Sequence, residues 1–346
     1  MSLLKIDMKN KRYLHALTVE ENTWSKRLSH ESRAKSPRYH PLIQSYSNEY
    51  ITGDHNTSWQ TYLKKSYNKF HRGLSLGGGV GFIEQELISM GLFEQFEMYD
   101  LSEKMTQRFL ERMEAGRKQT TITVRAQDLN FLELEEKNYD FILCNTILHH
   151  IINLEHLLMT VNSALTEGGI FVIYDYIGEN RFQWSKAKMA AINLIVQNLQ
   201  QSGYSLKRLE ERSEFNVIQN TPFEAIRSED IVPIVDQVFG PSKVMERKFF
   251  NVLHPSYRCL DFKNWSDENL RGCLSAFVEH DREESRKNQL QPCTLFGIYR
   301  KAKGTGVVAK AWSNEEVRSK LSLPLGIRAR NKGKMLLKRI LKLSPK

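Results

Sequence analysis

The sequence predicts an α/β protein with a doubly wound, mostly parallel sheet. Between residues 70 and 176, apolar runs of strand length alternate with segments of helical periodicity. Directly after the first run, four of the five residues from 77 to 81 are glycines. Strands that alternate with helices form parallel sheets with right-handed crossovers and helices on both faces. Ligands bind such sheets at strand-to-helix turns.

The elements of this region can be placed in order. Five strands are expected, at 72–77, 96–100, 121–128, 139–145 and 170–176. A helix over 82–91 ends at a glycine, which is common at helix C-termini. Ser102 offers an N-cap for a second helix, in which Met105, Phe109 and Met113 recur at four-residue spacing. A third helix, from Leu154, is expected to end at Gly168-Gly169.

After residue 176 the alternation is interrupted and then resumes. The pattern predicts a long helix over 185–212, then helices near 228–238 and 268–287 and closing strands near 243–250 and 293–301, for seven strands in all. We therefore expect five segments: an N-terminal helical cap, a core, a helical lid, the closing elements and a basic tail, at 1–65, 66–178, 179–229, 230–300 and 301–346.

The net charge of +10 is concentrated in the tail. Residues 301–346 hold 13 Lys and Arg and 2 Glu, which leaves 37 basic and 38 acidic residues in positions 1–300. A nearly neutral body argues against nucleic acid as a partner. In the tail, Met335, Leu336, Ile340 and Leu343 would share one face of a helix, which suggests contact with an anionic membrane or a protein; a solvated tail is the alternative.

The remaining composition indicates a cytoplasmic protein. The N-terminus lacks the features of a signal peptide, and no run reaches the roughly 18 apolar residues of a membrane helix. Cys144, Cys259, Cys273 and Cys293 show no CxxC or Cys/His spacing, so we expect reduced thiols and no metal site.

The glycine spacing distinguishes between phosphate-binding loops and other sites. A dinucleotide fingerprint needs G-x-G-x-x-G, but Phe82 stands at the third glycine position. No Gly-Lys-Ser/Thr follows, which excludes a P-loop. The spacing present is G-x-G-x-G, at Gly77, Gly79 and Gly81.

Taken in order, "LSLGGGVG", Asp100 at the end of the next strand, "AQD", "YDFILCNTILHH" and "GGIFVIYD" resemble the class I S-adenosylmethionine-dependent methyltransferases. The resemblance covers about residues 70–176 and, more loosely, the closing strands. It implies a Rossmann-like sheet and S-adenosylmethionine as cofactor. The cap, "YIGENRFQW" and "TPFEAIRS" also resemble a bacterial subgroup linked to polysaccharide and other biosynthesis.

The resemblance assigns a cofactor site. Asp100, followed by Leu101, is expected to bind the ribose hydroxyls, and Asp128 the adenine amino group, with Leu129 beside the ring. The other positions expected to line the site are Ser75, Gly77, Gly78, Gly79, Gly81 and Asn145. A glycine turn lets the backbone approach the methionyl part, whose carboxylate favours N–H groups at a helix start. Ser75 departs from the family pattern, which usually has Asp or Glu there.

Acceptor and catalytic residues are expected on the same side of the sheet. Histidine can take a proton at neutral pH, so His149 and His150 are candidate bases, although packing and capping would also explain them. Asp175 and Tyr176, at the end of the fifth predicted strand, are further candidates. The segments expected to form the acceptor wall supply Arg181, Trp184, Glu224, Arg227 and His254.

The predicted function is methyl transfer from S-adenosylmethionine to a small-molecule or saccharide acceptor, at oxygen with nitrogen as the alternative atom, by in-line displacement. Two alternatives stand beside it. A non-catalytic binding protein of the same fold is suggested by Ser75. A nucleic-acid methyltransferase is suggested by the basic tail, but "NTILHH" stands where such enzymes carry an Asn/Asp-Pro-Pro-Tyr/Phe stretch.

Overall fold

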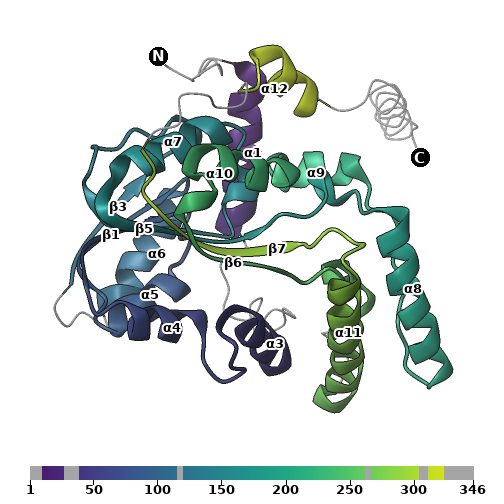
Figure 1. The fold of residues 1–346 in the computed structure, drawn as a ribbon. Coiled ribbons are helices and arrows are strands. Elements are labelled where there is room, and N and C mark those ends of the chain that lie inside the picture. The colour runs from purple at the N-terminus through teal and green to yellow at the C-terminus, as the bar shows by residue number, and fades with distance from the viewer. Residues whose placement is uncertain (1–9, 27–38, 115–119, 262–265, 304–310, 323–346) are drawn as a thin grey trace, which may run out of the picture.

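A computed structural model describes residues 10–26, 39–114, 120–261, 266–303 and 311–322. It contains one seven-stranded sheet with the strand order β3-β2-β1-β4-β5-β7-β6 (Figure 1). The strands are β1 (Phe70–Leu76), β2 (Phe93–Asp100), β3 (Thr121–Ala126), β4 (Tyr139–Asn145), β5 (Leu165–Tyr176), β6 (Val244–Phe250) and β7 (Thr294–Arg300). Strand β7 runs antiparallel to both of its neighbours, and the first five strands are parallel. The predicted fold class is confirmed.

Helices cover both faces of this sheet. The helices are α1 (Lys11–Lys26), α3 (Pro41–Thr52), α4 (Trp59–Ser66), α5 (Phe82–Ser89), α6 (Glu103–Glu114), α7 (Leu154–Ala164), α8 (Lys186–Gln201), α9 (Glu214–Asn220), α10 (Ile231–Phe239), α11 (Asp267–Lys287) and α12 (Asn314–Lys320). Helices α7 and α10 lie on one face, and α3, α4, α5 and α6 on the other.

The alternation of side chains along each strand divides the core between the two faces. On β4, Ile142 and Cys144 pack in the cluster beneath α7 and α10, whereas Phe141 and Leu143 pack with α4, α5 and α6. Successive residues of a strand point to opposite faces, so a strand that is buried on both sides is continuously apolar. This explains why β4 and β5 contain uninterrupted apolar runs.

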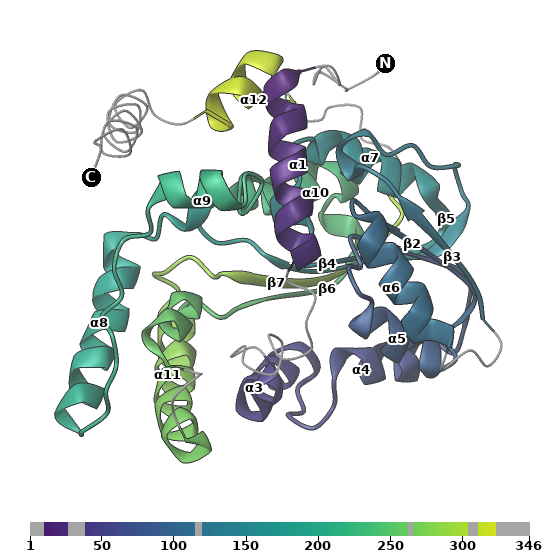
Figure 2. The ribbon, with the colours of Figure 1, turned by 180° about the vertical axis from the view of Figure 1, so that it is seen from behind.

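Helix α1 lies apart from these two layers, at the carboxyl ends of the parallel strands. Figure 2 shows it standing upright with α9 beside it. Tyr13 of α1 packs against Phe131, which follows β3, at a ring separation of 5.6 Å, and stacks on Phe223 at 5.6 Å. The N-terminal segment therefore contacts the turns in which ligand-binding residues are expected.

Several predicted boundaries were wrong. The helix from Leu154 ends at Ala164, and Gly168-Gly169 lies inside β5, where Gly169 approaches the backbone of Tyr139. The helix predicted over 185–212 ends at Gln201, and Gly203, with φ of 92°, follows it. The four cysteines are buried free thiols.

The predicted amphipathic helix of the tail lies outside the described residues. Among the described residues, no helix has the length and apolar character needed to cross a membrane.

Candidate active site at the carboxyl edge

The glycine turn connects β1 to α5 and leaves the backbone accessible. Gly77, Gly79 and Gly81 have φ of 71°, 59° and 70°, a region that side chains disfavour. A Cβ on Gly77 would overlap Ile147, and one on Gly81 would overlap Phe109. Around Gly79, no described atom lies within 4 Å of the Cβ position. Two glycines are thus required by packing, and the third leaves open space where a ligand can approach the backbone.

Asp100 ties the end of β2 to this turn. One carboxylate oxygen accepts a hydrogen bond from the backbone N–H of Gly79 at 3.0 Å, and the other accepts one from Ser102 at 2.9 Å. Burial raises the pKa of Asp100 above its ordinary value, and these N–H groups partly oppose the shift. Asp100 and Leu101 remain partly exposed beside the glycines.

Asp128 already has a partner from the N-terminal helix. The hydroxyl of Tyr13 donates to its Oδ2 at 2.6 Å, and the N–H of Asn130 donates to its Oδ1 at 3.0 Å. Burial raises the pKa of Asp128, which these hydrogen bonds oppose. Leu129 is buried beside it. Carboxylate oxygens can accept more than one hydrogen bond each, so these contacts are compatible with a further donor.

Ser75 is fully buried and donates to a carboxylate that sequence reasoning missed. Its hydroxyl lies 2.8 Å from Oε1 of Glu84, which is in the first turn of α5 and only 1% exposed. The carboxyl carbon of Glu84 lies 3.2 Å from the position of a Cβ on Gly78. Strand and helix therefore place an acidic group directly beneath the glycine turn.

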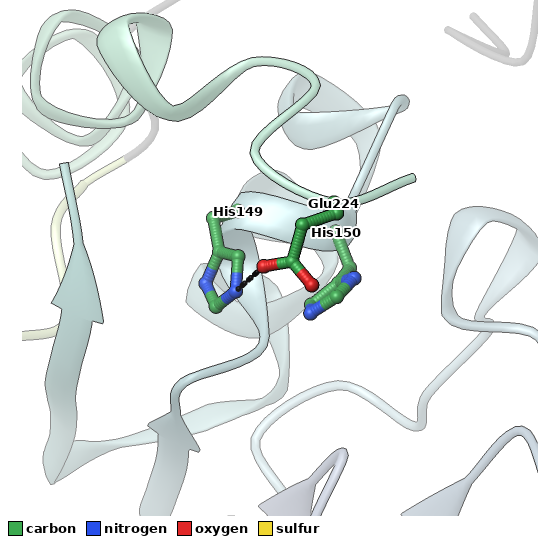
Figure 3. A group of neighbouring side chains, drawn as sticks. All are labelled: His149, His150 and Glu224. Atoms are coloured by element: carbon green, nitrogen blue, oxygen red, sulfur yellow. Dashed lines mark ion pairs between the residues drawn. The ribbon is translucent and has the colours of Figure 1, made fainter. Parts of the chain in front are cut away.

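His149, in the turn after β4, lies between the carboxylates of Asp175 in β5 and Glu224 in the loop after α9. Its Nδ1–H donates to Asp175 at 2.5 Å, and its Nε2 lies 3.4 Å from Glu224 (Figure 3). Asp175 also accepts the N–H groups of Ile147 and Leu148, which fixes the turn after β4. Burial lowers the pKa of His149, but the two carboxylates outweigh it and raise this pKa to about 10.

The ring of His150 contacts helix α1 through Glu20 and Trp24. Its Nδ1 lies 3.0 Å from Oε1 of Glu20, and its ring meets Trp24 edge-on at 5.3 Å. Glu20 also accepts the backbone N–H of Phe223 at 3.0 Å. We call the five residues that meet here the histidine cluster: His149, His150, Glu20, Asp175 and Glu224.

Backbone strain is concentrated around the histidine cluster. Thr146, Arg181, Phe182 and Ala225 are non-glycine residues with φ of 56°, 57°, 55° and 46°. Thr146 and Ala225 lie within three residues of a cluster member, the side chain of Arg181 donates to the carbonyl of Glu224 at 3.0 Å, and Phe182 follows Arg181. Such residues and buried titratable groups gather at functional sites.

The aromatic residues among the predicted acceptor residues lie close together. Tyr176 packs against Phe182 at 4.9 Å and His254 at 5.7 Å, with Trp184 beyond Phe182 at 6.2 Å. Tyr176 in turn meets the ring of His149 at 6.2 Å, which connects this aromatic group to the histidine cluster. Asn145 is partly exposed at the end of β4.

Arg227 is bound by other protein groups. It forms two hydrogen bonds to Glu155, at 2.9 and 2.8 Å, and further ones to Asp230 and to the carbonyl of Ile152. Its burial is explained without a ligand.

A mostly parallel sheet with an antiparallel β7, an open glycine turn after β1 and a carboxylate at the end of β2 is typical of class I methyltransferases, enzymes that use S-adenosylmethionine. Residues 46–220, about half of the chain, match a family model described as a methyltransferase domain. The chain belongs to this family and is an S-adenosylmethionine-dependent methyltransferase (EC 2.1.1).

Solved structures of low sequence identity resemble the chain. A Pyrococcus horikoshii OT3 protein is 13% identical, with 79% of this chain and 100% of that chain covered and a TM-score of 0.40. A Mesorhizobium loti S-adenosylmethionine-dependent methyltransferase is 17% identical, with coverages of 67% and 91% and a TM-score of 0.40. Haemonchus contortus phosphoethanolamine N-methyltransferase 2, bound to S-adenosylmethionine, is 18% identical, with coverages of 81% and 60% and a TM-score of 0.39. No curated protein matches the sequence.

Proposed function

We propose that the enzyme transfers a methyl group to an oxygen of a small-molecule or saccharide acceptor, bound beside the histidine cluster. We also propose that it belongs to the bacterial biosynthetic subgroup that its sequence resembles. The observation that carries the proposal is the meeting of buried charged groups and aromatic rings, Tyr176 and Phe182 among them, at the edge that holds the glycine turn. Polar groups that fix orientation and apolar rings that supply contact are typical of small-molecule sites.

The methyl transfer makes one bond and breaks one, and the acceptor hydroxyl also loses its proton. The acceptor oxygen bonds to the methyl carbon, the sulfur–carbon bond breaks with its electron pair left on sulfur, and the hydroxyl proton leaves toward the histidine cluster. The bound cofactor supplies an activated methyl group. Asp100 and Asp128 would hold its nucleoside. Because the charge is redistributed and no new ion is created at carbon, orientation of the reactants supplies most of the acceleration.

A panel of acceptors tests this function. The full chain is incubated with methyl-labelled S-adenosylmethionine and free sugars, nucleotide sugars, small phenols and amines, duplex DNA, RNA and protein. We expect label in an O-methyl group of a sugar or another small hydroxyl compound. Label found only on nucleic acid, protein or a nitrogen atom would contradict the proposal. The cofactor-site variant Asp100→Ala serves as the inactive control.

We further propose that Glu84 supplies the negative charge that the family usually places at Ser75. The S-adenosylmethionine amino group is cationic and lies, in the proposed site, over the glycine turn. Glu84 lies under that turn and is oriented by the hydroxyl of Ser75. The charge has thus moved from the strand to the first turn of α5, where the helix dipole also favours a carboxylate. This removes the argument for a non-catalytic protein.

Substitutions can remove the negative charge of Glu84 and then restore a negative charge at position 75. Glu84→Gln keeps the size and the contact with Ser75, and we expect it to weaken cofactor binding about tenfold, as for one charge-assisted hydrogen bond. The double variant Ser75→Asp/Glu84→Gln should recover affinity. Calorimetry with both S-adenosylmethionine and S-adenosylhomocysteine reports which charge is sensed, since only the first has a sulfonium. Glu86→Gln, in the same helix, is the matched control. Unchanged affinity in Glu84→Gln would exclude this role.

A further inference from the structure

The histidine cluster contains a convergent set of metal-ligand atoms. His149, His150 and Glu224 each offer one such atom, and these atoms all lie within 4.8 Å of one another. Figure 3 shows Glu224 between the two rings, with one carboxylate oxygen on His149 and the other directed at His150. The His149 Nε2–Glu224 distance of 3.4 Å is already close to the separation of two ligands on one ion.

His149 is oriented in the way that metal ligands are. Its Nδ1–H donates to Asp175 at 2.5 Å, whereas Nδ1 of His150 lies 3.0 Å from Oε1 of Glu20 without hydrogen-bond geometry. Metal-binding histidines usually give one ring nitrogen to such a carboxylate, which fixes the tautomer and leaves the other nitrogen for the ion. His149 shows this arrangement in full, and His150 has a carboxylate of α1 at the corresponding nitrogen.

The charges of the cluster also match a divalent cation. Glu20, Asp175 and Glu224 bring three carboxylates together, and the guanidinium of Arg181 lies beside Glu224. Histidines that bind a metal are neutral, so the proton that Asp175 and Glu224 hold on His149 would leave on binding, and the sum is then two negative charges. A bound divalent cation brings it to zero. The side chains of His149, His150 and Glu224 are 9%, 10% and 11% exposed, so the set is enclosed and still reaches solvent.

We propose that His149, His150 and Glu224 bind a divalent first-row transition-metal ion, with Asp175 and Glu20 as the carboxylates that orient the two histidines. Two imidazoles and one carboxylate are a common set for Zn²⁺ and Fe²⁺ and leave coordination positions open. The sequence predicted no metal because its Cys and His spacing has no known motif; these ligands come from adjacent residues after β4 and from a loop more than seventy positions later.

The ion would also explain the proton chemistry, and this step rests on the proposed function. A hydroxyl coordinated to a divalent cation loses its proton far more readily than a free one. An acceptor oxygen held on the ion would therefore be both oriented toward the methyl group and activated. The reacting bonds stay the same, and the proton leaves to solvent or to a carboxylate of the cluster.

Metal binding is tested without cofactor or acceptor. Full-length protein without a histidine tag is treated with a chelator, dialysed, and titrated with Co²⁺ by visible absorption and with Zn²⁺ by calorimetry. We expect one equivalent bound with micromolar or tighter affinity, and a visible Co²⁺ band. Glu224→Gln removes a ligand and Glu20→Gln an orienting carboxylate, and each should weaken binding about tenfold to a hundredfold.

The matched control is His71→Gln, which removes an exposed histidine that lies 2.7 Å from Glu94. It should bind metal as the unchanged protein does. Thermal melting of each variant shows that it is folded. Absence of stoichiometric binding in the unchanged protein, or equal weakening in His71→Gln and Glu224→Gln, would overturn the proposal. Cofactor affinity is measured on the same samples, so a failure of the metal site is distinguishable from a failure of the methyltransferase assignment.

Discussion

Two neighbouring groups of buried charges at the carboxyl edge differ in how completely they are paired. In the first, which we call the arginine cluster, Arg227 uses four of its five N–H groups on Glu155, Asp230 and the carbonyl of Ile152. In the histidine cluster, two rings share three carboxylates, and three ligand atoms converge on one point. The comparison separates a site built for stability from one built to bind.

The two clusters differ in how many of their hydrogen-bonding groups have partners and in their net charge. A bidentate pair between a guanidinium and a carboxylate satisfies both partners and leaves nothing for a ligand. An excess of carboxylates around imidazoles is costly when buried and needs a cation or protons to balance it. The burial of a charged cluster therefore does not by itself show whether the cluster binds a ligand.

The largest expected effect is on the arginine cluster. Arg227→Met leaves Glu155 buried without its cation, and removal of one partner of a buried pair typically costs about 3–5 kcal/mol. Urea denaturation should show this loss, while cofactor affinity, measured under conditions where the variant is folded, should not change. A variant as stable as the unchanged protein would mean that the pair is not structural.

A smaller effect is expected at Asp100, the partly exposed carboxylate at the end of β2. Asp100→Ala removes the predicted acceptor for the ribose hydroxyls, at about 2–4 kcal/mol, or on the order of a hundredfold in affinity. Calorimetry with S-adenosylhomocysteine measures it. Glu103→Gln, an exposed neighbour in α6, is the control. If both variants bind equally well, the ribose contact is misassigned.

Asp281, a buried carboxylate outside both clusters, shows how folding stability is expected to depend on pH. Asp281 accepts from the hydroxyl of Tyr46 and from the N–H of Leu253, but burial outweighs these contacts and raises its pKa to about 6. A raised pKa means that its contribution to folding is full below its ordinary pKa and is lost as pH rises through 6.

Asp281→Asn should therefore gain stability over the unchanged protein by up to about 2 kcal/mol between pH 4 and pH 7.5. Chemical denaturation at both pH values measures the change. A stability difference that is the same at both would show that Asp281 is ionised in the folded protein throughout.

The smallest effect on stability is expected in the histidine cluster itself. Glu224→Gln leaves His149 paired with Asp175, but burial of Glu224 is outweighed by the neighbouring histidines, which lower its pKa to about 2, so we expect a loss of about 1–2 kcal/mol in the metal-free protein, less than for Arg227→Met. Urea denaturation beside Arg227→Met makes the comparison direct. Similar losses in the two variants would remove the distinction between the clusters.

Local patterns in the sequence were sufficient for most of the fold. The apolar runs predicted all seven strands, and the spacing of Met105, Phe109 and Met113 predicted the buried face of α6. The errors occurred where the signal was tertiary. Gly168-Gly169 looked like a helix end because glycine favours both helix ends and close backbone contacts, and only the sheet shows that the second applies.

The candidate site was predicted in part for the same reason. Its residues at strand ends, such as Asp100 and Asp175, could be placed by their order along the chain. Tyr13, Glu20 and Glu84 could not, because each acts through a contact that no local spacing encodes. Tyr13 meets Asp128 across 115 positions, and Glu20 meets Phe223 across 203. Glu84 is only nine positions from Ser75, and its geometry is set by the turn between them.

Helix α1 gives Tyr13 to the aspartate after β3 and Glu20 to the histidine after β4. Helix α1 thus contacts both the turn after β3 and the turn after β4. Residues 11–26 therefore link the aspartate expected to bind adenine with the histidine cluster, two parts of the site that lie far apart in the sequence.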